Sequence, residues 1–212
     1  MENVEQLVHK AKSGDRAALE ELIAVHEKRI YNFIYRLTGN PDDAADLAQE
    51  TFLRVCTSIS CFRGDSSFVS WLYRIASNVC VDRARRRSRR RTVSLDAPVS
   101  VEDGEFLWAL SDDSPGPCDA VEAAEVGEVV RRAVASLPVD YRTVVVLHDL
   151  QDLSYREIAD VVGCPIGTVK SRLNRGRLAL KERLLARGAD RFLESRWGEV
   201  PAPASRLMPL AV

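Results

Sequence analysis

The sequence predicts an all-α fold in which two small helical domains are joined by a flexible acidic linker, with a helix-turn-helix in the second domain. Apolar residues recur three and four positions apart through most of the chain, as on the buried face of a helix. The length of 212 residues exceeds the soft prior of about 150 for one domain. Prolines and acidic residues interrupt the periodicity near the middle. We therefore expect a first domain over 1–91, a linker over 92–120, a second domain over 121–187 and a tail over 188–212.

A long helix in the first domain is predicted to end at Gly39, and the next to begin at Asn40-Pro41. Glycine adopts the left-handed conformation past a helix end most easily, and proline fits a first helical turn. The predicted buried positions of the two helices are Leu19, Leu22, Ile23, Ile30, Phe33, Ile34, Leu37, Ala44, Leu47, Ala48, Thr51, Phe52 and Val55. The opposite face of the second helix is polar and acidic, with Asp42, Asp43, Asp46, Gln49 and Glu50.

A further helix is predicted from about Ser67 and leads into a run of arginines. Its inward side chains are Phe68, Trp71, Leu72, Ile75, Ala76 and Val79, and its outward ones are Arg74, Asn78 and Asp82. Residues 83–91 then hold seven arginines in nine positions. Such a run suits contacts with phosphates, which contribute affinity but little sequence choice.

The middle of the chain is acidic, with nine acids and no base over residues 92–125. This composition predicts a flexible linker, although the apolar stretch at 105–110 is suited to docking on another surface. We hypothesise that the acidic segment folds back and screens the arginines in the free protein. After Arg187 the helical pattern weakens, which predicts a loose tail.

Helices are predicted to resume near Val121, to break at Pro138, and to continue over about 140–150. A helix-turn-helix follows. Ser154 and Glu157 have the spacing of a capping box, and Gly163 supplies the stop of that helix. Pro165 suits the first turn of the next helix. The face of the first helix is assigned to Ile158, Ala159 and Val162, and that of the second to Val169, Leu173 and Leu180.

The last predicted helix has the size, charge and hydrogen-bonding groups to enter a DNA major groove. Residues 166–187 hold seven basic side chains and one acid. Because this patch and the arginine run are separated by acidic sequence, the whole-chain net charge of −1 says little about where a polyanion binds. The alternative from the residues alone is a helical hairpin with a solvated basic face.

Composition excludes several classes of protein. The hydrophobic fraction of 46% suffices for packed cores, but no stretch approaches the ~20 apolar residues that span a bilayer. The acidic start, residues 1–5, lacks an apolar signal core, so we expect a cytoplasmic protein without membrane insertion. Five cysteines without a Cys-x-x-Cys pair predict buried thiols, with no metal and no cofactor. They are Cys56, Cys61, Cys80, Cys118 and Cys164.

Three motifs in order resemble a bacterial extracytoplasmic-function (ECF) sigma factor: DDAADLAQETF at 42–52, FRGDSSFVSWLYRIASN at 62–78, and the helix-turn-helix. The resemblance covers roughly residues 5 to 185. It implies an RNA polymerase specificity subunit without enzymatic activity or small-molecule substrate. Its implied partners are core RNA polymerase, promoter DNA and an anti-sigma factor, with the linker running through a basic polymerase channel.

The resemblance also implies site residues. The implied polymerase-binding residues are Asp46, Gln49 and Glu50, which share one helix face. Those for capture of a flipped base of the minus-ten element and for melting are Phe62, Arg63, Gly64, Asp65, Ser66, Ser67, Asn78, Arg85 and Arg86. Those for the minus-thirty-five element are Thr168, Lys170, Ser171, Arg172, Asn174 and Arg175. Pro165 departs from the small hydroxyl residue often found there. Asn174 stands where bulkier residues also occur, so the promoter preference of relatives does not transfer.

Two other functions compete with this one. A stand-alone transcription regulator would use the same helix-turn-helix but would need a dimer interface or a ligand domain. A metal-dependent nuclease could place Mg²⁺ on Asp42, Asp43, Asp46 and Glu50 because carboxylates suit that ion. No Lys or His catalytic set lies near those acids in the sequence, which argues against the nuclease hypothesis.

Overall fold

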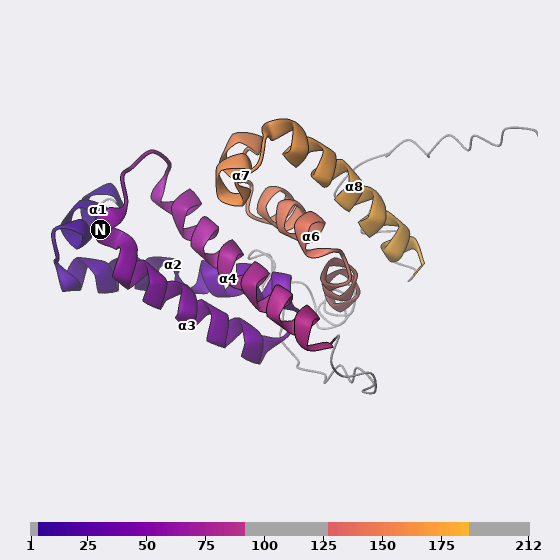
Figure 1. Cartoon of the computed structure of the whole chain (residues 1–212), viewed down its shortest axis with the longest axis horizontal. Coiled ribbons are helices and arrows are strands. Elements are labelled where there is room, and N and C mark those ends of the chain that lie inside the picture. The colour runs from indigo at the N-terminus through magenta and orange to yellow at the C-terminus, as the bar shows by residue number, and fades with distance from the viewer. Residues whose placement is uncertain (1–3, 92–126, 187–212) are drawn as a thin grey trace, which may run out of the picture.

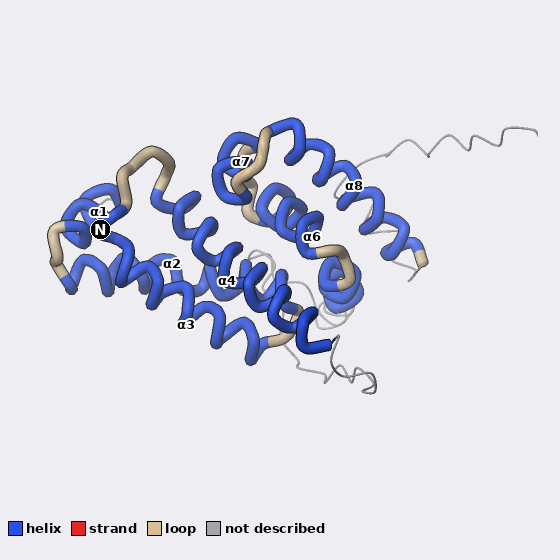
Figure 2. Tube along the Cα trace, viewed as in Figure 1, coloured by secondary structure: helices blue, strands red, loops and turns tan. Residues whose placement is uncertain are grey.

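The computed structural model describes residues 4–91 and 127–186, and every element in those ranges is helical (Figures 1 and 2). The all-α prediction is confirmed. The whole predicted linker over 92–120, residues 121–126 and 187 of the predicted second domain, and the predicted tail fall outside the described residues. The hypothesis that the acidic segment screens the arginines falls outside them as well.

The first domain contains α1 (Val4–Lys12), α2 (Arg16–Thr38), α3 (Pro41–Ser58), the short 3₁₀ helix η1 (Ile59–Cys61) and α4 (Phe68–Arg91). Helix α2 packs against α1, α3 and α4, so it forms the centre of the domain. Leu22, Ile30, Phe33 and Ile34 of α2 are almost fully buried there. The buried stripe of α2 is therefore the one that its apolar spacing predicts.

The junction of α2 and α3 follows the sequence signals at 39–41. Gly39 ends α2 with a left-handed φ of 72°, and its N–H donates to the carbonyl of Tyr35. Asn40 then caps α3, since its side chain accepts from the N–H of Asp43, and Pro41 is the first helical residue. The predicted end and start of the two helices are confirmed.

Helix α4 begins one residue later than predicted and continues through the arginine run to Arg91. Phe68, Leu72, Ala76 and Val79 are buried as predicted, whereas Trp71 and Ile75 are half-buried. The arginine run is thus an extension of a core helix, which holds its charges at helical spacing.

The second domain contains a helical stretch over residues 127–135, α6 (Val139–Val145), the π-helix η2 (Val146–Leu150), α7 (Tyr155–Val162) and α8 (Ile166–Leu185). The helix predicted over 140–150 therefore changes from α to π geometry at Val146. A π-helical turn is rare and leaves no period-3.6 signature to predict it from. Helix α8 packs mainly on α6 and α7.

The helix-turn-helix forms with the predicted caps. Ser154 and Glu157 make the complete capping box, and Gly163 ends α7 at φ 66°. Two details differ from the prediction. Val161 rather than Val162 is buried beside Ile158, and Pro165 precedes α8 as its N-cap instead of entering the first turn. Both are one-residue shifts, within the usual uncertainty of helix faces and ends.

The two domains contact each other along α4. Figure 1 shows α4 with α2 and α3 on one side and α6 and α7 on the other, and α4 contacts α7 directly. Contacts also join α2 to α6 and to η2. Helix α4 thus belongs to the core of the first domain and also provides the surface against which the second domain packs.

Candidate nucleic-acid interface

Helix α8 presents one polar face to solvent over its first three turns. Lys170, Ser171, Asn174 and Arg175 are exposed, and Thr168 is half-buried. Arg172 is also half-buried, with Nη2 at 3.7 Å from a carboxylate oxygen of Asp140. Five of the six predicted minus-thirty-five residues therefore lie on or beside one accessible face, while Arg172 already has an acidic neighbour.

Two contacts fix α8 on the rest of its domain. The side chain of Asp149 is only 8% exposed and accepts from Nε of Arg177 at 3.1 Å and from its Nη2. These hydrogen bonds raise the pKa of the Arg177 guanidinium. Gly176 faces α6 so closely that a Cβ there would lie 2.7 Å from Cγ2 of Val145. The exposed face of α8 is therefore held in a defined orientation.

Tyr155, at the start of α7, lies between a histidine and a lysine. Its ring centroid is 4.8 Å from that of His148, and Nζ of Lys170 lies 5.7 Å from it. Nδ1 of His148 in turn is 3.0 Å from the carbonyl oxygen of Leu153. A cation above an aromatic face is attracted by the ring quadrupole. Tyr155 thus orients Lys170, one of the predicted DNA-binding residues.

The loop at 62–67 joins η1 to α4. Arg63, Gly64, Asp65 and Ser67 are exposed and Ser66 is half-buried, with Gly64 at a left-handed φ of 84°. A left-handed residue at this turn is easily accommodated only by glycine. The loop is accordingly polar and accessible, as the prediction of a base-binding loop requires.

Phe62 differs from the other loop residues because it is buried. Its ring lies 5.2 Å from the ring of Trp71 and 6.0 Å from that of Phe68, centroid to centroid. Nζ of Lys12 lies 5.9 Å from the centroid of the Phe62 ring. Phe62 therefore anchors the start of the loop, and in the structure it is not available for stacking on a base.

His26 lies beneath the same aromatic cluster. It is 6% exposed, its ring is 5.5 Å from that of Phe68, and among the described residues no hydrogen-bond partner faces its Nε2. Burial lowers the pKa of this imidazole, and nearby Arg29 lowers it further. The neutral form of His26 is thus the one that fits the folded domain.

The side of α4 predicted to face DNA carries Asn78, Arg85 and Arg86, all exposed. Other arginines of the run are paired with the first domain's own acid. Nη2 of Arg83 lies 2.7 Å and Nη1 of Arg87 3.6 Å from oxygens of Asp43. Within the run, Arg85 and Arg86 are therefore exposed, whereas Arg83 and Arg87 form ion pairs with α3.

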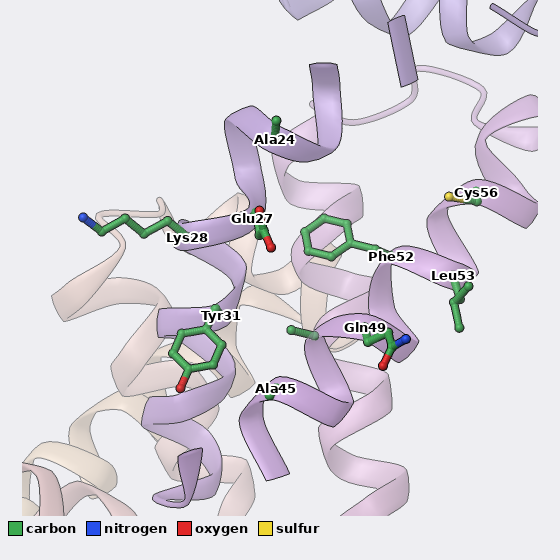
Figure 3. A pocket seen from close by; sticks show the side chains of 10 residues that line it. Ala24, Glu27, Lys28, Tyr31, Ala45, Gln49, Phe52, Leu53 and Cys56 are labelled. Carbon is green, nitrogen blue, oxygen red and sulfur yellow. The ribbon is translucent and has the colours of Figure 1, made fainter. Parts of the chain in front are cut away.

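The acidic face of α3 borders an open groove between α2 and α3, with a cavity volume of about 570 Å³ (Figure 3). Gln49 lines it together with Tyr31, Phe52 and Leu53, and Leu53 is 60% exposed. Asp46 is exposed one turn earlier. This surface places the exposed apolar side chain of Leu53 beside acidic and amide groups.

Glu50, the third predicted polymerase-binding residue, is half-buried and paired. Nη2 of Arg54 lies 2.6 Å from its Oε1, and Nη1 of the same arginine lies 3.9 Å from Oδ2 of Asp82 on α4. Arg54 therefore connects the acidic face of α3 to α4. The sequence did not single out this residue, since an arginine four positions after Glu50 has the spacing of an ordinary surface ion pair.

The described residues hold no group of three or more His, Cys, Asp or Glu side chains arranged for a metal ion. This finding gives no support to the nuclease alternative. In the same part of the chain, no helix is long and apolar enough to cross a membrane.

Comparison with known families places two matches on the two domains. The Sigma-70 region 2 family matches residues 22–90, and the Sigma-70, region 4 family matches residues 127–180. Each match falls on one helical domain, with α4 at the end of the first and most of α8 at the end of the second.

Curated relatives span nearly the whole chain. ECF RNA polymerase sigma factor SigW of Bacillus subtilis is 36% identical over 182 residues, covering 85% of this chain and 96% of that protein. RNA polymerase sigma-H factor of Pseudomonas aeruginosa is 37% identical over 186 residues, covering 86% and 94%. The ECF RNA polymerase sigma-E factor of Escherichia coli K12 is 34% identical, covering 84% and 92%.

Two solved structures are similar in fold. Sigma factor RpoE, bound to the anti-sigma factor NepR of Bartonella quintana, superposes with a TM-score of 0.63 at 25% identity, covering 78% of this chain and 95% of that one. CnrH, bound to the cytosolic domain of CnrY, gives a TM-score of 0.58 at 24% identity, covering 85% and 96%.

Proposed function

Because this chain belongs to the family of extracytoplasmic-function sigma factors, we propose that it binds core RNA polymerase, directs it to bipartite promoters and helps to melt the minus-ten region. The observation that carries this proposal is that each of the two matched regions, 22–90 and 127–180, contains one exposed polar surface suited to DNA. Its relatives are transcription initiation factors rather than enzymes. The chain therefore acts by binding, in the cytoplasm where the polymerase works.

The exposed face of α8 is assigned to the minus-thirty-five element. Arg175 is the best candidate for a bidentate contact with guanine, because it is exposed at the third turn of a helix sized for the major groove. Lys170, held by Tyr155, is placed for a phosphate or a base edge. The ion pair of Arg177 with Asp149 keeps this face rigid, so specificity is set before DNA arrives.

The loop at 63–67 and Asn78 are assigned to the minus-ten element. Capturing a base outside the stack requires hydrogen-bonding groups on an accessible and adaptable segment. The polar loop supplies them, and the cluster of Phe62, Phe68 and Trp71 anchors its base. Arg85 and Arg86 add sequence-independent contacts with phosphates.

The acidic face of α3 and its groove are assigned to core polymerase. The exposed Leu53 and the half-buried Phe52 suit an apolar side chain of a partner helix, and Asp46 suits a basic one. Asp46→Arg should therefore impair polymerase binding by at least tenfold while the thermal unfolding of the chain stays unchanged. Glu5→Arg, an exposed acid of α1, is the matched control for the change of charge.

We further propose control by an anti-sigma factor. A protein of similar fold, sigma factor RpoE, was solved in complex with the anti-sigma factor NepR. A partner that binds one arrangement of the two domains shifts the population toward that arrangement. It thereby weakens the binding of polymerase to a different arrangement.

The deciding experiment is in vitro transcription from a library of promoter-like DNA with core polymerase freed of its own sigma subunit. Start sites that appear only with this protein, and that share two spaced sequence elements, are the expected result. Tight DNA binding by the protein alone with no new transcripts would instead favour a stand-alone regulator. Circular dichroism on the same preparation confirms that the protein tested is folded.

A further inference from the structure

Helix α1 precedes the part of the chain that the Sigma-70 region 2 family matches, which begins at residue 22. It is nevertheless part of the core, because Leu7, Val8 and Ala11 are buried and the helix contacts both α2 and η1. Figure 1 shows α1 at the end of the first domain where η1 leads into the loop before α4. The fold thus places α1 beside the loop at 62–67, although the proposed function gives this helix no role.

The last turn of α1 is held in place by the residues that follow it. The carbonyl oxygen of Lys10 accepts from the hydroxyl of Ser13 at 2.7 Å and from the N–H of Asp15 at 3.1 Å. The side chain of Asp15 in turn caps α2. Because this turn is bonded to the start of α2, the backbone at Lys12 has a defined position relative to the rest of the domain.

Lys12 reaches from this turn to the residue that anchors the loop. It is exposed, and its Nζ lies 5.9 Å from the centroid of the Phe62 ring. Among the described residues, no acid forms an ion pair with Lys12. A lysine can lie against an aromatic surface by its stem and still keep its ammonium group in water. Lys12 therefore adds an accessible positive charge where the loop begins.

The arginines already assigned to phosphates lie far from this loop. Proteins that hold single-stranded bases also carry positive charge along the backbone of the strand. At about 1.5 Å per residue, Arg85 lies about 26 Å along α4 from Phe68, where the loop ends. That length corresponds to about seven or eight nucleotides at 3.4 Å each. Arg74 lies about 9 Å along α4 from Phe68, but it lines a pocket with Ile166 at the start of α8.

The loop supplies no net positive charge by itself. Arg63 is its cation and Asp65, two residues later, is its acid, so their charges cancel over residues 62–67. Lys12 changes this balance, because it brings a second cation to the start of the loop from another element. A strand whose base is captured by the loop would thus meet positive charge from both the loop and α1.

We propose that Lys12 extends the surface for the minus-ten element onto α1 by binding a phosphate of the single strand beside the captured base. Arg63 and Lys12 then hold the strand from the loop and from α1. Because a phosphate contact carries no sequence information, Lys12 contributes affinity for melted DNA and no base preference. This inference rests on the proposed function and adds to it a helix outside the matched region.

The test uses the full chain assembled with core polymerase, on a promoter recovered by transcription with the unmodified chain. The minus-ten region of this template is kept open by mismatches, so that binding does not depend on melting. Lys12→Met removes the charge and keeps an apolar side chain beside Phe62. It should weaken binding about three- to tenfold at low salt. It should also reduce the slope of log affinity against log salt by about 0.7, as for one phosphate contact on a single strand.

Lys10→Met is the matched control on the same helix. Lys10 is also exposed, but it lines a different hollow together with Glu5, Gln6 and His9. Its replacement should leave both affinity and salt slope unchanged. Lys12→Arg retains the positive charge and should preserve both quantities. If Lys12→Met alters thermal unfolding, Lys12→Gln takes its place in the same measurement.

The salt slope separates a phosphate contact from a purely structural one. A lysine that only stabilised the anchor at Phe62 would weaken binding without changing the slope, and this result would overturn the proposal. Equal affinity and slope for Lys12→Met and the unmodified chain would overturn it as well. In both cases the unmodified chain still selects promoters, so the proposed function stands. If the unmodified chain selects no promoter with core polymerase, the proposed function fails and the role of Lys12 fails with it.

Discussion

The two regions proposed to bind DNA differ in how firmly the fold holds them. The face of α8 is rigid, because Gly176 seats the helix against α6 and Asp149 holds Arg177. The loop before α4 is anchored at its aromatic base, but its residues 63–65 are exposed, with a glycine at its turn. A rigid helix suits base edges in intact duplex, whereas an adaptable loop suits a base that has left its stack. The comparison indicates that specificity and melting make different demands on one chain.

The largest effect on this difference is expected from a substitution that displaces α8 from α6. Gly176→Ala places a Cβ 2.7 Å from Val145 and 3.3 Å from Cβ of Tyr141, so α8 must move away from α6. We expect a loss of about 1–3 kcal/mol in the free energy of unfolding, as for overpacked cores. Chemical denaturation followed by circular dichroism measures it.

Gly167→Ala is the matched control, because a Cβ there meets nothing within 4 Å. Alanine is favoured over glycine inside a helix by about 1 kcal/mol, so this variant should be neutral or more stable. Equal stability of the two variants would mean that the seat of α8 tolerates a methyl group and is less rigid than we describe.

The difference between specific and nonspecific contacts is sharpened by comparing Arg175 with Arg87. Arg175→Ala should relax the preference at one upstream base pair by about 1–3 kcal/mol. Arg87→Ala should weaken binding to all sequences and reduce the salt slope by about one. Promoter-library binding at several salt concentrations separates the two effects. Uniform weakening by both variants would contradict the assignment of Arg175.

The capping signals of both regions could be predicted from sequence. Ser154 with Glu157, and Gly39 before Asn40-Pro41, act through neighbours within a few residues, so their patterns determine local structure. The exposed face of α8 followed from helical periodicity in the same way. By contrast, Arg131 and Arg142 have the sequence pattern of ordinary charged positions. Their partners, the carbonyls of Gly39 and Leu37, lie 92 and 105 residues away, beyond any local signal.

The sequence also did not predict which aromatic side chains of the two regions are buried or in contact. Phe62 belonged to a motif of a base-binding loop, yet it packs into the aromatic cluster, because a large ring beside Phe68 and Trp71 gains more from burial than from exposure. Tyr155 carried no signal for its contact with Lys170, which arises only when α7 and α8 are folded together.

The stability of the aromatic cluster that anchors the loop at 62–67 should depend on pH, because His26 lies beneath it. Burial lowers the pKa of His26 below its ordinary value of about 6.5, so the unfolded chain binds the proton more readily. The stability contributed by neutral His26 is present above that value and is lost as the pH falls below it. Thermal unfolding between pH 7 and 5 should show this fall.

His26→Leu should remove that part of the pH dependence, whereas His9→Leu, at an exposed position of α1, should preserve it. An unchanged slope in the His26 variant would show that other groups account for the loss of stability.

The smallest expected effect concerns the arginine run. Asp43→Asn removes the acid that neutralises Arg83 and Arg87, so affinity for nonspecific DNA should rise by severalfold at low salt and by less at high salt. Fluorescence anisotropy with a random duplex measures the change. Asp42→Asn, the exposed neighbouring acid, controls for net charge. A rise of the same size in both variants would attribute the effect to overall charge.

Arg54 joins the two functional faces of the first domain, since its guanidinium lies between Glu50 on α3 and Asp82 on α4. A cationic group of a partner that paired with Glu50 would leave Arg54 to Asp82 alone and so change the charge balance of α4. Under the proposed assignment of α4 to DNA, thermodynamic reciprocity requires that DNA change the affinity at Glu50 by the same factor. With both assignments, one shared side chain couples the two binding equilibria of this domain.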